Sequence, residues 1–293
     1  MVVVVTGANG FVGRRLTQVL VEQGVDVLPL ARGASPLPLL QRAKVVVHLA
    51  ARVHVMDDRS PSPMEEFRQA NVLATSTLAR QAAAAGVSRF VFISSVKVNG
   101  EQTQPNCPFT EDDDPNPQDA YAQSKHEAEL ALREVAAQTG LEVVIIRSPL
   151  VYGAGVKANF RSLMNAVIRR WPLPFGALTN VRSLVGLDNL VDFIRLCMVH
   201  PAAANETFLV SDGKDFSTPQ LIRELAVAAG VKPNLWTIPV WMLKWPAALL
   251  GRQNAVQRLC GNLQVDITKA RMLLGWSPPV SMQEGLKKTV TKA

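Results

Sequence analysis

The stretch VVVVTGANGFVG, residues 2–13, decides how this chain folds. Its valines predict a short buried strand, and Gly7, Gly10 and Gly13 then follow at a spacing of three before a helical pattern that runs through Val21. Glycines at these positions let the backbone turn tightly and approach a pyrophosphate, which lies against the exposed N–H groups at the helix start. Because a strand precedes the triplet and a helix follows it, the segment predicts a dinucleotide-binding site rather than an ordinary tight turn.

Further apolar runs suited to strands recur along the first half of the chain, with helical patterns between them. One helical pattern covers 65–86, where Gly86 supplies a C-terminal stop. Strands that alternate with helices predict a parallel sheet covered on both faces. The strand candidates are 2–6, 25–31, 44–50, 89–95 and 142–148, and beyond about residue 150 the alternation loosens into helical stretches at 159–170 and 188–200.

The predicted fold is therefore α/β, with a Rossmann-type doubly wound parallel sheet and a smaller mixed C-terminal lobe. Residues 1–155 are expected to form the dinucleotide-binding core. Residues 156–293 are expected to form mainly a substrate-binding lobe, with segments that return to the core. Hydrophobic residues make up 48% of the 293 residues, which is enough to bury a sizeable core.

Cysteine and histidine spacing argues against a disulfide framework and against a metal site. The N-terminal apolar run meets Gly7 far sooner than a signal peptide or a membrane span would end. We therefore expect a protein of the reducing cytoplasm that binds no metal. The residues concerned are Cys107, Cys197, Cys260, His48, His54, His126 and His200.

The formal net charge of +7 would suit nucleic-acid binding. Basic residues, however, occur at most in pairs, and aromatic residues are not interleaved with them. We expect no nucleic-acid partner, and the charge suits either attraction of phosphorylated ligands or an ordinary solvated surface.

The segment 232–252 combines three tryptophans with three prolines. A membrane-surface helix is one interpretation. The prolines interrupt any helix, so packing against the C-terminal lobe is favoured and no stable membrane insertion is expected. The residues are Trp236, Trp241, Trp245, Pro233, Pro239 and Pro246.

The end of the second predicted strand indicates which dinucleotide binds. An NAD enzyme places a carboxylate there to bond the adenosine ribose, whereas this chain has Ala31 and Arg32. Alanine leaves room for a 2′-phosphate and the guanidinium can pair with it, so NADP(H) is favoured. NAD(H) is the alternative cofactor, and an exposed surface arginine is the non-functional interpretation.

The segment YAQSK, residues 121–125, opens a helical stretch that runs to about Gln138. Tyr121 and Lys125 are four residues apart and therefore share a helix face. A tyrosine can exchange a proton with a carbonyl or alcohol if its pKa falls from ~10 toward neutrality, a stabilisation of roughly 4 kcal/mol. An ammonium ~4 Å away at an effective dielectric of ~20 supplies about that much, so we expect Lys125 to lower the pKa of Tyr121.

Ser95 stands at the end of a predicted strand, where α/β sheets bind their ligands. Alone it would be an ordinary strand-end serine, but beside Tyr121 and Lys125 it is predicted to polarise the substrate oxygen. His48 is expected to pack near the cofactor rather than act as a base. The acidic run 111–114 is expected to be a solvated loop, with a place at the active-site entrance as the alternative.

Five motifs recur in one known family. They are TGANGFVG at 6–13, HLAA at 48–51, FISS at 92–95, YAQSK at 121–125 and LGWSPPVSMQEGL at 274–286. In combination they resemble the extended short-chain dehydrogenases/reductases, the NAD-dependent epimerase/dehydratase family. The resemblance implies that Ser95, Tyr121 and Lys125 are catalytic, and that Lys125 also holds the nicotinamide ribose. It further implies a homodimer, and cofactor contacts from Gly7, Asn9, Gly10, Phe11, Val12, Leu49, Ala50, Ala51, Asn71, Tyr121, Lys125 and Pro149.

Two segments of the second lobe, KANF at 157–160 and VRSLV at 181–185, are similar to the family's uridine-diphosphate segments. They imply that Asn159 and Arg182 contact the nucleotide, while Ser95 and Tyr121 meet the sugar. The fork of an arginine suits the anionic oxygens of a diphosphate.

Longer strings are most similar to the bacterial O-antigen subgroup known as UDP-N-acetyl-quinovosamine dehydrogenases. That subgroup implies reduction of the 4-keto group of a UDP-linked 6-deoxy-N-acetylhexosamine, in lipopolysaccharide precursor synthesis. The strings are SSVKVNGE, LVYGAGVKANF, RSLVGLDNLVD and TFLVSDG.

Two features depart from the family pattern. Only 33–43 separate Arg32 from the HLAA strand, where the family usually has a further strand and helix with an acidic residue at the adenine. Asn99 replaces the tyrosine usually found before the glycine that follows the catalytic serine.

Dehydration is disfavoured, because Val96 and Lys97 stand where dehydratases carry Asp-Glu. A net reductase is favoured, since Arg32 and the shortened adenine side suit a cofactor that exchanges at each turnover. A UDP-hexose 4-epimerase with retained NAD is the alternative. A non-catalytic dinucleotide-binding regulator is the second alternative, against which the intact pair of Tyr121 and Lys125 argues.

Overall fold

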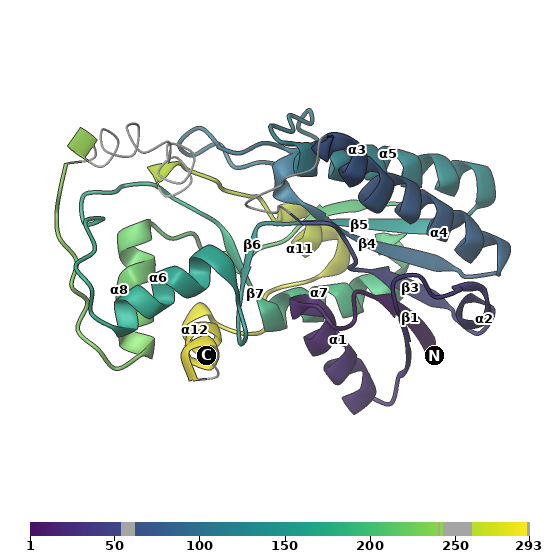
Figure 1. Ribbon diagram of the computed structural model, residues 1–293, viewed down its shortest axis with the longest axis horizontal. Helices are drawn as coiled ribbons and strands as arrows, with labels where there is room; N and C mark the ends of the chain where they lie inside the picture. The colour runs from purple at the N-terminus through teal and green to yellow at the C-terminus, as the bar shows by residue number, and fades with distance from the viewer. Residues whose placement is uncertain (54–61, 240, 243–259, 292–293) are drawn as a thin grey trace.

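The main element of the molecule is a six-stranded parallel sheet with the order β2-β1-β3-β4-β5-β8 (Figure 1). The computed structural model describes residues 1–53, 62–239, 241–242 and 260–291. The predicted α/β fold is confirmed. The strands are β1 (Val2–Thr6), β2 (Asp26–Leu30), β3 (Val45–His48), β4 (Arg89–Ser95), β5 (Glu142–Ser148) and β8 (Thr207–Leu209).

Helices cover both faces of the sheet, because successive strand residues point to opposite faces and most of them are apolar. Val3 and Val5 of β1 belong to the core under α1 and α7, whereas Val4 belongs to the core under α4 and α5. In Figure 1 the first helix pair lies below the sheet and the second above it. These helices are α1 (Phe11–Glu22), α4 (Ala74–Ala84), α5 (Ala120–Thr139) and α7 (Leu187–Val199).

The chain changes its direction across the sheet after β2. Strand β2 lies on one side of β1 and β3 on the other, so the topological switch point of the sheet lies between β1 and β3. Doubly wound sheets bind ligands at such a switch point. Between β2 and β3, where every residue is described, the structure has only the short helix α2 (Leu37–Leu40). The shortened connection is confirmed, and it leaves β2 as an edge strand.

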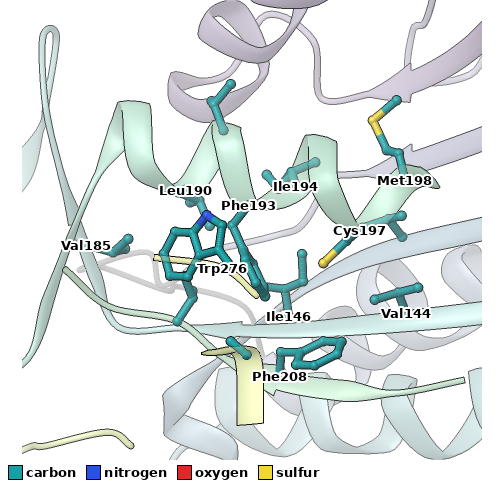
Figure 2. Packing of buried hydrophobic residues seen from close by; sticks show 14 of the residues in the cluster. Val144, Ile146, Val185, Leu190, Phe193, Ile194, Cys197, Met198, Phe208 and Trp276 are labelled. Atoms are coloured by element: carbon teal, nitrogen blue, oxygen red, sulfur yellow. The ribbon is translucent and has the colours of Figure 1, made fainter. Parts of the chain in front are cut away.

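The second half of the chain returns to the sheet through α7 and β8. The ring of Phe193 in α7 packs against Trp276 at a centroid distance of 4.7 Å and against Phe208 of β8 at 5.7 Å (Figure 2). The indole N–H of Trp276 donates to Asp192 Oδ2 at 3.0 Å, so the large ring is buried without losing its hydrogen bond. The late LGW motif therefore serves to close the core beside α7.

A smaller lobe forms beside the sheet, and its core includes Tyr152, Phe160 and Leu286. Tyr152 is fully buried, and its hydroxyl donates to Asp212 Oδ2 at 2.6 Å. The other elements of the second half of the chain are the parallel pair β6 (Leu150–Tyr152) and β7 (Leu184–Gly186), with α6 (Ala158–Ile168), α8 (Thr218–Ala228), α11 (Thr268–Leu274) and α12 (Met282–Thr291).

The predicted helix over 65–86 is interrupted by a π-helical turn. Helix α3 (Pro63–Phe67) leads into a π-helix at Arg68–Leu73, which continues as α4. Buried Asn71 lies within that turn, and π turns are frequent at functional sites. The helices predicted at 159–170 and 188–200 are confirmed as α6 and α7. Single 3₁₀ turns lie at Val96–Val98 and Pro201–Ala203.

The tryptophan-rich segment attaches to the C-terminal lobe through its backbone but not through its rings. The backbone of Trp236 bonds to that of Leu173, while the Trp236 ring is 56% exposed and the Trp241 ring 69% exposed. The described part of the segment therefore packs against the lobe, as predicted, through its backbone and Leu235, while Trp236 and Trp241 are exposed. Trp245 and the rest of that prediction lie outside the described residues. Among the described residues, no helix is both long enough and apolar enough to span a membrane.

The acidic run at 111–114 is solvated only in part. Asp112, Asp113 and Asp114 are exposed, but Glu111 accepts the backbone N–H of Leu209 in β8 at 2.7 Å. Burial raises the pKa of Glu111. The prediction of a wholly solvated loop is thus wrong for Glu111, whose carboxylate ties the loop to the edge of the sheet.

A buried ion pair joins α5 to the sheet. The Nη2 atom of Arg147 in β5 lies 2.7 Å from Oε2 of Glu129 in α5, and both side chains are almost fully buried. Ser94 Oγ donates to the same carboxylate at 2.5 Å, and Arg147 also donates to Asn99 Oδ1 at 3.0 Å. Asn99, which departs from the family pattern, is therefore part of a structural network.

We expect Glu129→Gln to lower the free energy of unfolding by about 3–5 kcal/mol, because it leaves the Arg147 guanidinium buried without a counter-charge. The measurement is urea denaturation at neutral pH. A double variant, Glu129→Leu with Arg147→Met, removes both charges. Its free energy of unfolding should be closer to that of the native protein than the value for Glu129→Gln is. An unchanged midpoint for Glu129→Gln would contradict this account of the ion pair.

Candidate active site

The loops that follow β1 and β3 meet at the switch point between these strands. A Cβ added at Gly7 would lie 2.9 Å from the backbone nitrogen of Ala50, so only glycine allows this approach. Leu49, Ala50 and Ala51, which were predicted to lie along the cofactor, follow β3 directly and are half-buried at this point.

The glycine loop has the shape that a pyrophosphate needs. The N–H of Gly10 donates to the carbonyl of Gly7 at 2.8 Å, and a Cβ added at Gly13 would lie 2.1 Å from that oxygen. Gly10 caps α1 without a side-chain hydrogen bond, and the first helical turn has no acidic residue. The N–H groups and the positive end of the helix dipole thus meet no competing carboxylate, an arrangement that fits an anionic dinucleotide. In the same loop Asn9 is exposed, and Phe11 and Val12 are half-buried.

His48 is a structural residue beneath this loop, as predicted. Its Nδ1 lies 2.8 Å from Thr6 Oγ1 and its Nε2 lies 3.0 Å from Thr75 Oγ1. Thr6 Oγ1 in turn accepts the N–H of Ala50 at 3.1 Å. Burial, and secondarily the charge of Lys125, lowers the pKa of His48 to about 3. A neutral imidazole therefore braces the ends of β1 and β3.

Asn71 links the segment that follows β3 to α5 through hydrogen bonds. Its side-chain nitrogen donates to Ser124 Oγ at 2.9 Å, and its oxygen accepts the backbone N–H of Arg52 at 2.7 Å. Ser124 Oγ donates to the carbonyl of Tyr121 at 2.8 Å. Asn71 therefore orients the first turn of the helix that carries Tyr121, besides lying near the predicted cofactor path.

Tyr121 and Lys125 lie on the first turns of α5, at the carboxyl end of β4. Lys125 is buried, and its Nζ donates to the carbonyl of Ile93 at 2.7 Å. The same ammonium lies 4.3 Å from the centre of the Phe92 ring. The half-buried Tyr121 ring packs edge-on against Phe67 at a centroid distance of 6.3 Å.

The predicted direction of the Tyr121 pKa shift is wrong. Burial, and secondarily the Asp119 carboxylate, raises the pKa of Tyr121 to about 12. Burial also lowers the pKa of Lys125 to about 7, against the opposing effect of Glu129. The lysine is thus only partly charged at neutral pH, and its Nζ donates to a backbone carbonyl, so the phenol keeps its proton.

The turn that follows Ser95 is joined to the start of α5 by an ion pair. Ser95 ends β4 in register with Ser148, and its Oγ accepts the N–H of Lys97 at 3.2 Å. Lys97 Nζ lies 2.5 Å from Asp119 Oδ2, and Asp119 is the N-cap of α5. This pair therefore joins the turn after Ser95 to the helix start that carries Tyr121.

Sequence reasoning did not single out Lys97 or Asp119 as site residues. Asp119 carried a usable signal, because an aspartate directly before a helical pattern indicates an N-cap. Lys97 carried none, since its partner is 22 positions away in the sequence.

The remaining predicted residues lie on several elements. Pro149 is buried between β5 and β6. Arg182 precedes β7, and its backbone forms bridges to Phe216 and Leu263. Its guanidinium donates to the carbonyl of Gly261 at 3.1 Å. Asn159 is exposed on the first turn of α6, and Arg32 is exposed just after β2.

The carboxyl edge of the sheet combines a glycine loop whose shape suits an anion with a protonated phenol, a serine hydroxyl and a buried lysine. The combination suits proton transfer beside a bound dinucleotide. The described residues hold no group of three or more His, Cys, Asp or Glu placed to bind a metal ion.

The description "NAD dependent epimerase/dehydratase family" belongs to the family model that matches residues 3–211. The chain belongs to this family. The match spans the six-stranded sheet from Val3 onward and includes Ser95, Tyr121 and Lys125.

This family member is similar to characterised proteins over its whole length. A UDP-glucose 4-epimerase of Vibrio cholerae is 45% identical, over 98% of this chain and 94% of its own. A UDP-glucose 4-epimerase of Thermotoga maritima, solved with UDP-glucose, is 25% identical and superposes with a TM-score of 0.78 over 100% of this chain and 98% of its own. RMD of Pseudomonas aeruginosa, solved with NADPH, shares the fold with a TM-score of 0.80 at 22% identity, over 100% of this chain and 99% of its own.

The neutral His48 should make the stability of this family member fall at mildly acidic pH. Its pKa is about 3 in the folded chain and 6.5 in an unfolded one, so between these values only the unfolded state binds the proton. Between about pH 7.5 and about pH 5.5, the free energy of unfolding should fall by about 1.4 kcal/mol more in the native protein than in His48→Asn. Urea denaturation at both pH values measures this, and equal pH dependence in the two proteins would show that His48 is protonated when folded.

Proposed function

We propose that this family member is an NAD(P)-dependent oxidoreductase that reduces the 4-keto group of a UDP-linked 6-deoxy-N-acetylhexosamine, in O-antigen precursor synthesis. The observation that carries the proposal is the state of Tyr121. Because its pKa is raised to about 12, the phenol holds a proton before reaction, which is the state a reductase needs.

The proposed reaction assigns one task to each of three residues. When bound, the reduced nicotinamide supplies a hydride to the sugar carbonyl carbon. Tyr121 donates its proton to the carbonyl oxygen, and the Ser95 hydroxyl donates a hydrogen bond to that oxygen as negative charge develops on it. The product is the sugar alcohol.

Lys125 limits the cost of the phenolate that remains on Tyr121. A negative charge nearby favours the protonated form of a lysine, so the pKa of Lys125 should rise as the phenol loses its proton. A lysine with a resting pKa of about 7 can therefore become fully charged at the moment when its charge is useful.

A UDP-sugar substrate is supported by the similarity to two UDP-glucose 4-epimerases. Arg182 lies just before β7 and Asn159 on the first turn of α6, and we assign both to the nucleotide diphosphate. We further propose a cytoplasmic homodimer.

A UDP-hexose 4-epimerase with retained NAD is the second candidate, and the 45% identity to the Vibrio cholerae protein favours it. Both activities use the same serine, tyrosine and lysine. They differ in whether the dinucleotide leaves after each turnover.

NADP(H) is the favoured cofactor within this proposal, and NAD(H) is the alternative. Arg32 is exposed directly after the edge strand β2, where its guanidinium has room to pair with a 2′-phosphate. Gly7, Gly10, Phe11 and Val12 would hold the pyrophosphate.

Tyr121→Phe should lower kcat for NADPH-dependent reduction of a UDP-4-keto-6-deoxy-N-acetylhexosamine by a factor of about 10²–10⁴, because it removes the proton donor. Tyr152→Phe is the matched control. It removes the same atom from the chain's second tyrosine, which is buried in the smaller lobe, and should keep kcat. NADPH oxidation gives the rate, and NMR gives the configuration at C4.

Two outcomes of this experiment would contradict the proposal. Unchanged turnover in Tyr121→Phe would revive a non-catalytic, dinucleotide-binding role. A purified protein that carries bound NAD and interconverts UDP-hexoses without added cofactor would establish the epimerase.

Arg32→Ser should raise KM for NADPH by about tenfold or more and leave KM for NADH unchanged, because only the 2′-phosphate loses a charged partner. Arg42→Ser is the control, since Arg42 is an exposed arginine beside the same strand and pairs with Asp26 at 3.5 Å. Steady-state kinetics with each cofactor measure the two KM values. An equal rise in KM for NADPH and for NADH would remove the argument for NADP(H).

A further inference from the structure

Exposed tryptophans gather on one lobe of the molecule. Among the four tryptophans that the structure describes, Trp276 is buried, whereas Trp171, Trp236 and Trp241 are 56%, 56% and 69% exposed. Soluble proteins seldom leave several large aromatic rings in water, and a group of them marks an interaction surface.

Trp171 and Trp236 stand on adjoining backbone segments. The N–H of Leu173 donates to the carbonyl of Asn234, and the N–H of Trp236 donates to the carbonyl of Leu173, both at 2.8 Å. Leu173 is buried in the core of the smaller lobe and Leu235 packs against that core. Since successive side chains of an extended segment point to opposite sides, Trp236 faces solvent.

Basic side chains lie beside the two indoles. Exposed Arg169 and Arg170 directly precede Trp171, and the Arg169 guanidinium lies 5.9 Å from the centre of the Trp171 ring. Lys232 is exposed on the adjoining segment. We define the tryptophan–arginine patch as Ile168, Arg169, Arg170, Trp171, Lys232 and Trp236, all of which are exposed.

The sequence around the patch is free of carboxylates. Segments 143–187 and 225–265 contain ten Lys and Arg residues and no Asp or Glu. Because the whole chain has a formal charge of +7, the remainder carries −3. One of the ten, Arg147, is neutralised by Glu129 in the sheet. Positive charge is thus concentrated in the two stretches of sequence that carry the exposed indoles.

We propose that the tryptophan–arginine patch docks this protein on an anionic lipid surface. Indole rings are amphipathic and settle at the headgroup level of a bilayer, and nearby Lys and Arg are attracted by anionic lipids. A second copy of this chain suits the patch less well, because a two-fold interface would place the same positive patch against itself.

Docking in this way would hold the candidate active site close to the lipid. The patch begins at the C-terminal end of α6, and Asn159 lies on the first turn of the same helix. An 11-residue helix is about 16 Å long. About this distance therefore separates the patch from Asn159. Figure 1 shows α6 and α8 at the opposite end of the molecule from α2, which would point away from the surface.

The test is flotation of the full chain with vesicles of phosphatidylcholine alone and with vesicles that also contain phosphatidylglycerol. We expect binding to the anionic vesicles only, and weaker binding at about 1 M salt, where the screening length falls to about 3 Å. Binding to neither kind of vesicle would overturn the proposal.

Variants show whether the patch is the surface that binds. Trp171→Ser with Trp236→Ser should weaken vesicle binding by about tenfold or more, and Arg169→Ser or Lys232→Ser by about fivefold each. The controls are Met272→Ser, an 82% exposed residue on α11, and Arg80→Ser on α4, and both should bind as the native protein does. Turnover of a water-soluble substrate should be unchanged in all of them, which also shows that they fold.

Two further results would contradict the proposal. Equal loss of binding in patch and control variants would mean that the patch has no special part in it. A double tryptophan variant that turns a dimer into a monomer in sedimentation, without any change in vesicle binding, would assign the patch to contacts between copies of the chain.

Discussion

The Glu129 carboxylate of α5 is buried between this helix and the sheet, and it accepts hydrogen bonds from two neighbouring strands. Ser94 of β4 donates at 2.5 Å and Arg147 of β5 at 2.7 Å. Glu129 is one helical turn beyond Lys125 and two turns beyond Tyr121. A buried charge tolerates little separation from its counter-charge, so this contact sets where along the strands the lysine and tyrosine stand. The positions of Tyr121 and Lys125 therefore depend on a buried ion pair one and two helical turns away.

Much of the fold could be predicted because its signals are local. The valines of β1, the glycines after it and the apolar runs of β3 to β5 each identify their own element, and the switch between β1 and β3 then follows from the order of elements. The Tyr121 and Lys125 pair was predictable for the same reason, since a spacing of four places both on one helix face.

The remaining features depend on partners far apart in the sequence. Arg147 and Glu129 are 18 positions apart, and Glu111 meets a backbone N–H that is 98 positions away. The pKa of Tyr121 could not be predicted from the lysine alone, because burial and the Asp119 cap act in the opposite direction. The exposure of Trp236 likewise depends on how its segment meets Leu173, which composition does not reveal.

The short connection after β2 leaves that strand without a neighbour on one side. An unpaired strand is a template on which other chains can add, and such growth leads to aggregates. Proline lacks the N–H that a new strand would need, and it is tolerated in sheets almost only at edges. Strand β2 carries Pro29, opposite Val5. The strand that the short connection leaves at the edge of the sheet thus holds a residue that a central strand would rarely tolerate.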